Sequence, residues 1–130
     1  MKIIGTGVDI IENKRILRLI KNPNFIKRVF NQQEIISSKN PKNKQNFFAK
    51  RFAAKEAFSK ALGTGFRNKL NYRDIEISND EIGKPYFKIN TKIKKLIQKL
   101  FKIKSFNFFL SISDEKKYSI AFVILQKKWK

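Results

Sequence analysis

The 130-residue sequence contains no cysteine and no histidine. Without cysteine the chain has no disulfide bridges, no thiolate zinc sites and no thiol nucleophile. Without histidine it has no imidazole metal ligands and no Ser-His-Asp triad. Any acid–base or metal chemistry must therefore use carboxylates, lysine, tyrosine or water.

Long apolar runs are also absent from the sequence. No stretch approaches the ~20 residues that span a membrane, and the first residues lack the apolar core and cleavage site of a signal peptide. We therefore expect a soluble, cytoplasmic chain with no membrane partner. We expect residues 1–130 to form a single domain, which at this length buries about two-thirds of the surface exposed by its unfolded chain.

Acidic residues are scarce: 10 Asp and Glu stand against 30 Lys and Arg, and the net charge is +20. Lys, Ile, Phe and Asn, which dominate the composition, have A/T-rich codons, so base composition accounts for part of the lysine excess. The charge indicates polyanionic partners, which include phosphate-rich cofactors and acidic proteins as well as nucleic acids. Arginine, whose planar fork binds phosphates and guanine edges, is uncommon here, which argues against a dedicated nucleic-acid binder.

Hydrophobic periodicity predicts an α+β fold, an antiparallel sheet packed with helices. Gly5 and Gly7 interrupt the first apolar run, which predicts a buried strand with close backbone approach. Asn31 and Glu34 have the spacing of a capping box, which predicts the start of a helix. We expect strands over 3–11, 74–78, 86–89, 106–113 and 118–126, helices over 12–20, 25–30, 47–62 and 91–102, and a mobile loop over 37–46.

Residues 47–62 have the strongest helical pattern. Five of the chain's six alanines lie here, and Gly63 supplies a stop. Because the composition is otherwise poor in alanine, this cluster indicates that another element packs closely against the helix.

Two of the ten acids, Asp9 and Glu56, are the candidates for chemistry. Asp9 lies among apolar residues, where an ionised carboxylate needs a cation. A purely structural salt bridge is as good an explanation of this residue as a role in chemistry. Glu56 shares a helix face with Phe52, Lys60 and Gly63. The alternative for Glu56 is an ordinary i, i+4 pair with Lys60, worth about 0.3 to 0.5 kcal/mol.

The same helix face ends on Gly63, Thr64 and Gly65, where the backbone can come close to a bulky ligand. Two hard carboxylates from a strand and a helix, with lysine beside them, suit Mg²⁺ that also carries phosphate oxygens.

Three segments of the chain resemble a known family. They are Gly7-Val8-Asp9-Ile10, the run from Arg51 to Gly65, and Gly83-Lys84-Pro85. Their order and spacing, with the closing strand at 110–113, closely resemble the holo-acyl-carrier-protein synthases, the small 4′-phosphopantetheinyl transferases. The resemblance covers nearly the whole chain, and its long central motif is specific.

The resemblance implies transfer of the 4′-phosphopantetheine group of coenzyme A to a serine of apo-acyl carrier protein in fatty acid biosynthesis, leaving 3′,5′-ADP. It implies that Asp9 and Glu56 hold Mg²⁺ against the pyrophosphate. It also implies that Glu56, directly or through a metal-bound water, takes the serine proton while Lys60 steadies the phosphates. The residues that it places around the coenzyme are Arg51, Lys60, Gly63, Thr64, Gly65, Lys84 and Pro85.

The resemblance further implies a homotrimer with active sites between protomers. It also implies that an acidic acyl carrier protein docks on the basic helical segment near the start of the chain, where Arg15, Arg18, Lys21 and Arg28 are the candidate contacts. As a group, these charges steer an acidic partner, an effect that salt weakens.

Asp114 departs from the family pattern, because relatives usually have histidine there. A carboxylate cannot donate a hydrogen bond as histidine does, and it repels a nearby phosphate. Either that contact is dispensable, or Asp114 points away, or coenzyme A binds more weakly. An inactive homologue that acts as a scaffold is therefore one competing interpretation. The other, a nucleic-acid-binding module with Phe66 or Tyr72 as stacking platforms, lacks any recognisable motif, so we expect no nucleic-acid partner.

Overall fold

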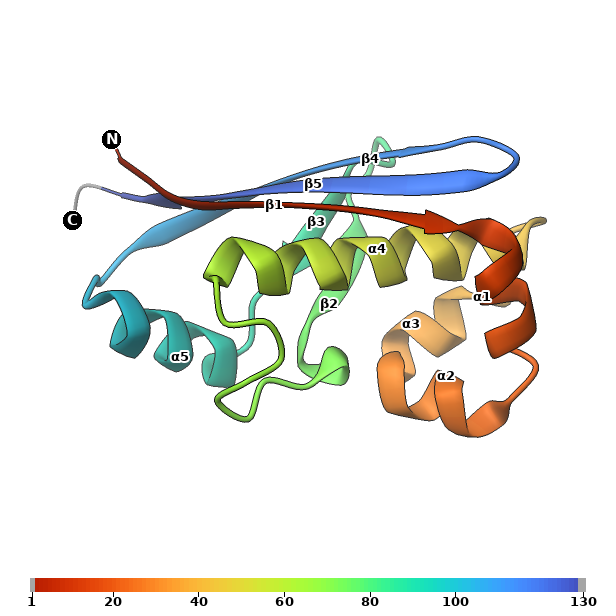
Figure 1. Ribbon diagram of the computed structural model, residues 1–130, viewed down its shortest axis with the longest axis horizontal. Helices are drawn as coiled ribbons and strands as arrows, with labels where there is room; N and C mark the ends of the chain where they lie inside the picture. Colours follow the sequence, from red (N-terminus) through yellow and green to blue (C-terminus); the bar gives the residue numbers. More distant parts are fainter. Residues whose placement is uncertain (1, 129–130) are drawn as a thin grey trace.

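The computed structural model describes residues 2–128 of the chain (Figure 1). Strand β1 (Lys2–Glu12) leads into three short helices, α1 (Asn13–Leu19), α2 (Pro23–Val29) and α3 (Gln32–Ser37). The long helix α4 (Lys44–Leu62) follows, then a single 3₁₀ turn η1 (Tyr72–Asp74) and strands β2 (Glu76–Asn79) and β3 (Pro85–Lys88). Helix α5 (Thr91–Phe101) precedes the closing hairpin of β4 (Phe106–Asp114) and β5 (Tyr118–Lys127).

Both sheets of the fold are antiparallel. β1, β5 and β4 form a three-stranded sheet in that order, and β2 pairs with β3 in a second sheet. Helix α4 lies along one face of the three-stranded sheet, and the three short helices gather near its first turns (Figure 1). The predicted α+β fold and the predicted terminal hairpin are therefore confirmed. None of the helices within residues 2–128 is both long and apolar enough to cross a membrane.

Strand β1 and helix α4 approach so closely that only glycine fits on the strand. A Cβ built on Gly7 would lie 1.9 Å from the carbonyl oxygen of Ala57, and one built on Gly5 would lie 1.9 Å from that of Ala61. These alanines are buried and keep the helix surface flat. The close packing predicted from the glycines and from the alanine cluster is thus confirmed.

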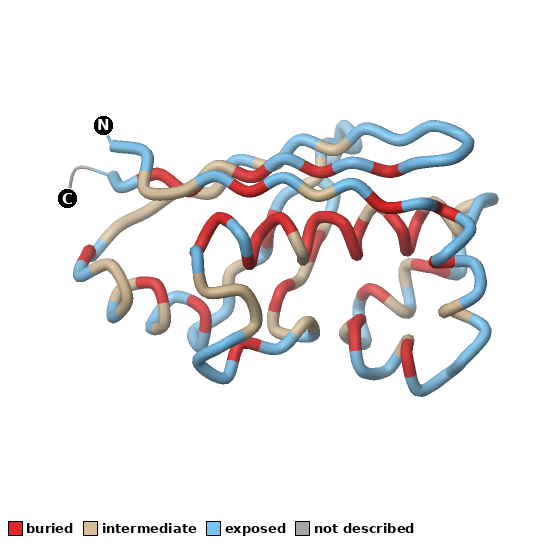
Figure 2. Tube along the Cα trace, viewed as in Figure 1, coloured by how far each residue is buried: buried red, intermediate tan, exposed pale blue. Residues whose placement is uncertain are grey.

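Alternation along β1 decides which side chains meet the helix. Successive strand residues point to opposite faces, so Asp9 and Ile11 lie on the same side of the sheet as Gly7. Ile11 is buried, whereas Val8 and Ile10 on the other side are exposed. Figure 2 shows this alternation of buried and exposed residues along the strands. One face of the sheet is therefore packed, and the other is left uncovered.

Aromatic rings fill the space between α4 and the two sheets. The ring of Phe58 stacks on Phe108 of β4, with 4.4 Å between the ring centroids, and meets Phe87 of β3 edge-on at 4.8 Å. Phe58 and Phe87 belong to one hydrophobic core, Phe108 packs against it, and Phe87 extends it to the smaller sheet.

The segment at 37–46 differs from the predicted loop. Helix α4 begins at Lys44 rather than at residue 47, because the side chain of Asn43 caps it by accepting a hydrogen bond from the Asn46 amide. The first turn of this helix is polar, and apolar periodicity begins only at Phe47. A pattern of apolar residues therefore cannot locate the true start of the helix.

We expect Gly7→Ala to lower the free energy of unfolding by about 3 kcal/mol, because the added methyl group overlaps the Ala57 carbonyl and forces β1 away from α4. Urea denaturation followed by circular dichroism measures the change. Thr6→Ala, on the exposed side of the same strand, is the control and should cost less than about 1 kcal/mol. Wild-type stability in Gly7→Ala would contradict the close contact.

Candidate active site

Asp9 lies on the side of β1 that faces α4, and its side chain is only 18% exposed. Its Oδ1 accepts a hydrogen bond from Lys60 Nζ at 3.2 Å. The same ammonium group donates to the carbonyl oxygen of Val8 at 3.0 Å, and the Lys60 side chain is 53% exposed. Lys60 therefore supplies the cation that the sequence context of Asp9 requires.

Glu56 lies one helical turn before Lys60 and is half-buried. Its Oε1 accepts a hydrogen bond from the hydroxyl of Tyr72 in η1, with 2.6 Å between the oxygens. Within the described residues Lys60 makes its ion pair with Asp9, so the alternative of an ordinary Glu56–Lys60 pair is wrong.

The negative charges of Glu56 and Asp9 both act on the phenol of Tyr72. Burial is the largest cause that raises its pKa above the ordinary value of 10.0, and the hydrogen bond and negative charge of Glu56 raise it further. The charge of Asp9 acts in the same direction, and Arg15 of α1 opposes it. Asp9, Glu56 and Tyr72 therefore share one electrostatic environment where β1, α4 and η1 meet.

This pair of acids has the chemistry of a partial magnesium site. Two carboxylates from neighbouring elements supply hard oxygen ligands, and Mg²⁺ commonly completes its shell with water and substrate phosphates. Between residues 2 and 128 no group of three or more acidic side chains could hold a metal ion. A metal at Asp9 and Glu56 would therefore depend on oxygens from a phosphate-bearing ligand or water.

Tyr72 is the part of this site that the sequence analysis missed. Its ring stacks on Phe66, with 3.8 Å between centroids, and on Phe52, with 5.6 Å. It is thus engaged by aromatic rings of its own chain rather than standing free as a platform for a base. No periodic pattern connects Tyr72 with Glu56, which lies 16 residues earlier, so the sequence carries no signal for their contact.

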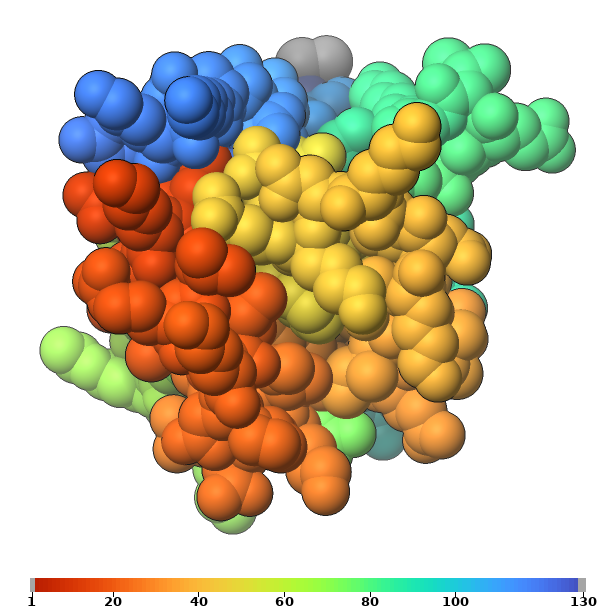
Figure 3. Space-filling view, turned by 90° about the vertical axis from the view of Figure 1, so that its right-hand side faces the viewer, coloured from red at the N-terminus to blue at the C-terminus, as the bar shows by residue number. Residues whose placement is uncertain are grey.

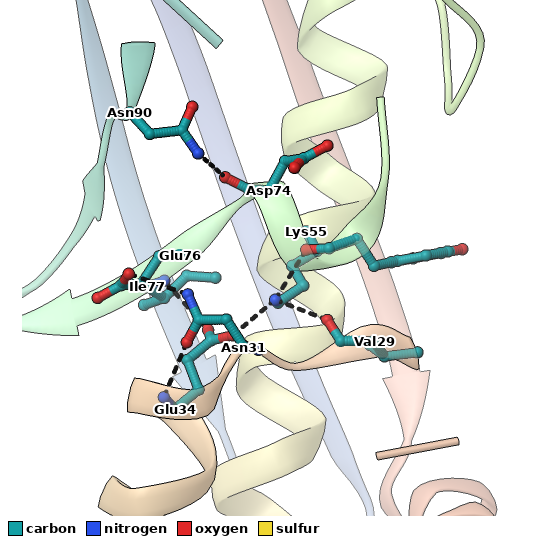
Figure 4. A network of polar contacts seen from close by, with 9 residues as sticks. Val29, Asn31, Glu34, Lys55, Asp74, Glu76, Ile77 and Asn90 are labelled. Carbon is teal, nitrogen blue, oxygen red and sulfur yellow. Dashed lines mark hydrogen bonds and ion pairs between the residues drawn. The ribbon is translucent and has the colours of Figure 1, made fainter. Parts of the chain in front are cut away.

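A buried ion pair joins Lys55 of α4 to Glu34 of α3 (Figure 4). Lys55 Nζ lies 2.7 Å from Glu34 Oε1, and both side chains are almost fully buried. The ammonium also donates to the carbonyl oxygens of Val29, at 2.8 Å, and Tyr72, at 2.9 Å. Burial lowers the pKa of Lys55, and the charge of Glu34 opposes that shift.

Glu34 extends the network to two further elements. Its Oε1 accepts from the amide of Asn31, whose side chain in turn accepts from the Glu34 amide, so the predicted capping box is confirmed. Its Oε2 accepts from the amide of Ile77 in β2 at 3.1 Å. Through this network the ends of α2 and α3, together with η1 and β2, are attached to the middle of α4.

Arg51 lies on a different side of α4 from Glu56, since five residues rotate a helix by about 140°. Its guanidinium is buried, donates to the side-chain oxygen of Asn79 at 2.9 Å and lies 3.7 Å from the centroid of the Phe47 ring. Its buried Nε has no hydrogen-bond partner among the described residues.

A depression beside α4 brings Arg51 together with one other residue of the predicted coenzyme-binding set, Pro85. Gly83 and Pro85 line it, and so does Asp114 at the end of β4. Asp114 Oδ2 accepts a hydrogen bond from the side-chain amide of Asn46 at 2.8 Å. The lining includes neither Asp9, Glu56 nor Lys60, and Lys84 is exposed next to it.

The turn that ends α4 presents bare backbone. Gly63 and Gly65 have φ angles of 77° and 60°, in the left-handed region that favours glycine. A Cβ built on either would meet no atom within 4 Å. The turn formed by Gly63, Thr64 and Gly65 is therefore open to close approach, as the sequence analysis expected.

The four basic residues predicted to receive a carrier protein occupy the helical end of the molecule that Figure 3 shows. Lys21 lines a depression between α1 and the segment before α4, and Arg28 lines another between α2 and η1. Arg15 lies near Tyr72, and Arg18 is exposed in the last turn of α1. The structure thus distributes them over two depressions and a helix surface.

Comparisons with known proteins place this geometry in a family. A model of the 4′-phosphopantetheinyl transferase superfamily matches residues 5–123. The holo-[acyl-carrier-protein] synthase of Pelagibacter ubique is 66% identical over 128 residues, which are 98% of this chain and 100% of the relative. That of Clostridium botulinum is 45% identical over 123 residues, covering 94% and 96% of the two chains.

Solved structures agree with the sequence relatives. The holo-[acyl-carrier-protein] synthase from Neisseria meningitidis has a TM-score of 0.88 and 40% identity, covering 97% of this chain and 100% of its own. A Bacillus anthracis synthase in complex with CoA (3′,5′-ADP) has a TM-score of 0.80 and 36% identity, covering 97% and 98%.

The chain therefore belongs to the 4′-phosphopantetheinyl transferase superfamily. Within it, the matches over nearly the full length are to the holo-acyl-carrier-protein synthases, a class of transferase enzymes.

Proposed function

We propose that this chain transfers the 4′-phosphopantetheine group of coenzyme A to a serine hydroxyl of apo-acyl carrier protein. The reaction depends on Mg²⁺, releases 3′,5′-ADP and serves fatty acid biosynthesis in the cytoplasm. The observation that carries the proposal is that Lys60 pairs with Asp9 while Glu56, one turn earlier on α4, acts with Asp9 on the same Tyr72 hydroxyl, in a chain without histidine or cysteine. The names of the relatives support the same reaction.

Glu56 is the group that takes the serine proton, directly or through water, because its half-buried carboxylate lies one helical turn from Lys60 and acts with Asp9 on the same Tyr72 hydroxyl. The serine oxygen then bonds to the phosphorus that bears the pantetheine arm, and the bond from that phosphorus to the 3′,5′-ADP oxygen breaks. Asp9 and Glu56 would hold Mg²⁺, which would supply positive charge to neutralise the diphosphate. Lys60, half exposed, binds phosphate oxygens through its ammonium group.

The candidate coenzyme residues form two groups on different sides of α4. Lys60 and the glycine turn accompany Asp9 and Glu56, whereas Arg51 and Pro85 line the separate depression. Arg51, which lines that depression, supplies a guanidinium charge that can attract a phosphate. We propose that one coenzyme molecule contacts the first group on one protomer and the second group on its neighbour, within a homotrimer.

The outer face of the three-stranded sheet offers a surface for that assembly. Cross-strand pairing places Val8 beside Phe122 and Ile10 beside Ile120, with Phe109 on the next strand. These five apolar side chains are between 38% and 61% exposed. Contiguous apolar patches on soluble proteins commonly mark interaction sites, and a further copy of the chain is the occupant that completes the divided coenzyme site.

Apo-acyl carrier protein incubated with the purified chain, Mg²⁺ and coenzyme A should gain about 340 Da, the mass of the transferred group. Intact-protein mass spectrometry measures the gain. Asp9→Ala and Glu56→Ala should each reduce the rate by about 10³-fold or more, since each removes a metal ligand, while circular dichroism stays unchanged. No mass gain with the wild-type chain would refute the activity, and full activity in both variants would refute the metal assignment.

Phe122→Glu should dissociate the assembly, because it introduces a charge at the centre of the apolar sheet face. Sedimentation equilibrium should give the wild-type protein three times the chain mass of 15.4 kDa and the variant a single chain mass. Thr91→Glu, at the exposed start of α5, is the matched control and should remain trimeric. A wild-type monomer in solution would count against the shared site.

An acidic carrier protein docks, on this proposal, at the helical end through Arg15, Arg18, Lys21 and Arg28. Arg15 connects this surface with the site, since its charge reaches Tyr72. Arg18→Glu should raise the KM for the carrier protein about tenfold at low salt, and the difference should shrink as salt is added. Lys99→Glu on α5 is the control for net charge. Equal KM values for Arg18→Glu and wild type would contradict the docking surface.

A further inference from the structure

We propose that Tyr72 is a positioning residue for Glu56: its hydroxyl fixes one oxygen of the carboxylate and thereby orients the other toward the reacting groups. The inference rests on the proposed transferase function, because it assigns Tyr72 a role in that same site.

The contact itself has the geometry of a strong hydrogen bond. The 2.6 Å between Tyr72 Oη and Glu56 Oε1 lies within the range found when a hydroxyl donates to a carboxylate. Among the described residues, Tyr72 is the hydrogen-bond donor to this carboxylate, and it occupies Oε1 alone. Oε2 is left to interact with a metal ion, a water molecule or the serine hydroxyl.

Tyr72 can hold Glu56 because its own position is fixed on several sides. Its ring stacks on Phe52, one turn before Glu56 on α4, with 12° between the ring planes, and on Phe66 with 26°. Its carbonyl oxygen accepts from the buried ammonium of Lys55 at 2.9 Å. The hydroxyl is thus anchored at the backbone and at the ring, both against α4, the helix that carries Glu56.

The 3₁₀ turn that contains Tyr72 is secured independently. The amide of Asn71, the residue just before the turn, donates to Asp74 Oδ2 at 2.9 Å. The same Asp74 oxygen lies 2.6 Å from Lys92 Nζ of α5. The turn is therefore tied to α5 as well as to α4, which keeps the phenol from drifting away from Glu56.

Glu56 needs such a partner because its side chain is flexible. A glutamate turns about three side-chain torsions, and a carboxylate that must take a proton loses rate when it is displaced by as little as about 1 Å. Partners that hold ligating carboxylates in place typically contribute 10- to 100-fold to metal affinity or activity. The Tyr72 hydroxyl is placed to make this contribution.

Tyr72→Phe tests the role, since it retains the ring and its two stacks and removes the hydroxyl alone. We expect kcat to fall about tenfold or more while the KM for coenzyme A changes less than about threefold. Mn²⁺ binding to the protein alone, measured by electron paramagnetic resonance, should weaken about tenfold, and the melting temperature should stay within about 2 °C of wild type. Tyr118→Phe, which removes the hydroxyl of an exposed tyrosine, is the matched control and should match wild type in each measurement.

Wild-type kcat and Mn²⁺ affinity in Tyr72→Phe would overturn the proposal. So would a loss of kcat that a parallel drop in melting temperature accounts for, because the hydroxyl would then support only the fold. If the wild-type chain transfers no phosphopantetheine, it is the proposed function that fails. The Mn²⁺ titration then still decides whether Tyr72 orients Glu56.

Discussion

The contact between β1 and α4 is the constraint on which the rest of the structure depends. Glycine at positions 5 and 7 and alanine at positions 57 and 61 let two backbones approach so closely that the two strand positions have no room for a side chain. Because strand residues alternate, this contact also decides that Asp9 faces the helix. A slip of one residue would turn the carboxylate to the outer face. The same glycines that pack the core therefore keep the site in register.

Much of the fold could be predicted from the sequence, because apolar periodicity reports burial directly. The glycines in β1 and the alanines in α4 each indicated a close contact, although the sequence did not show that these two elements are each other's partner. The start of α4 could not be placed in this way, since its first turn is polar and depends on the cap at Asn43. The turn η1 carries no periodic pattern at all, and its position depends on contacts with α4 and α5.

The site was predictable where it is local in sequence and unpredictable where it is not. Glu56 and Lys60 lie on one helix face, and the apolar context of Asp9 required a cation. Tyr72 reaches Glu56 only because the chain turns back after Gly65. The spacing of residues within a helix or strand cannot predict a contact that depends on the course of a loop. The separation of Arg51 from Glu56 could have been predicted from the sequence, because their spacing alone places them on different sides of a helix.

The buried pair of Lys55 and Glu34 shows which property of the protein these two charged residues serve. An ion pair in a dry interior contributes little net stability over an apolar pair of equal volume. What two apolar side chains could not do is bind the Tyr72 carbonyl and the Ile77 amide at fixed points. The benefit of burying the two charges is thus the accurate placement of η1 and β2 against α4. A sequence selected for thermal stability alone would have apolar residues at these two positions.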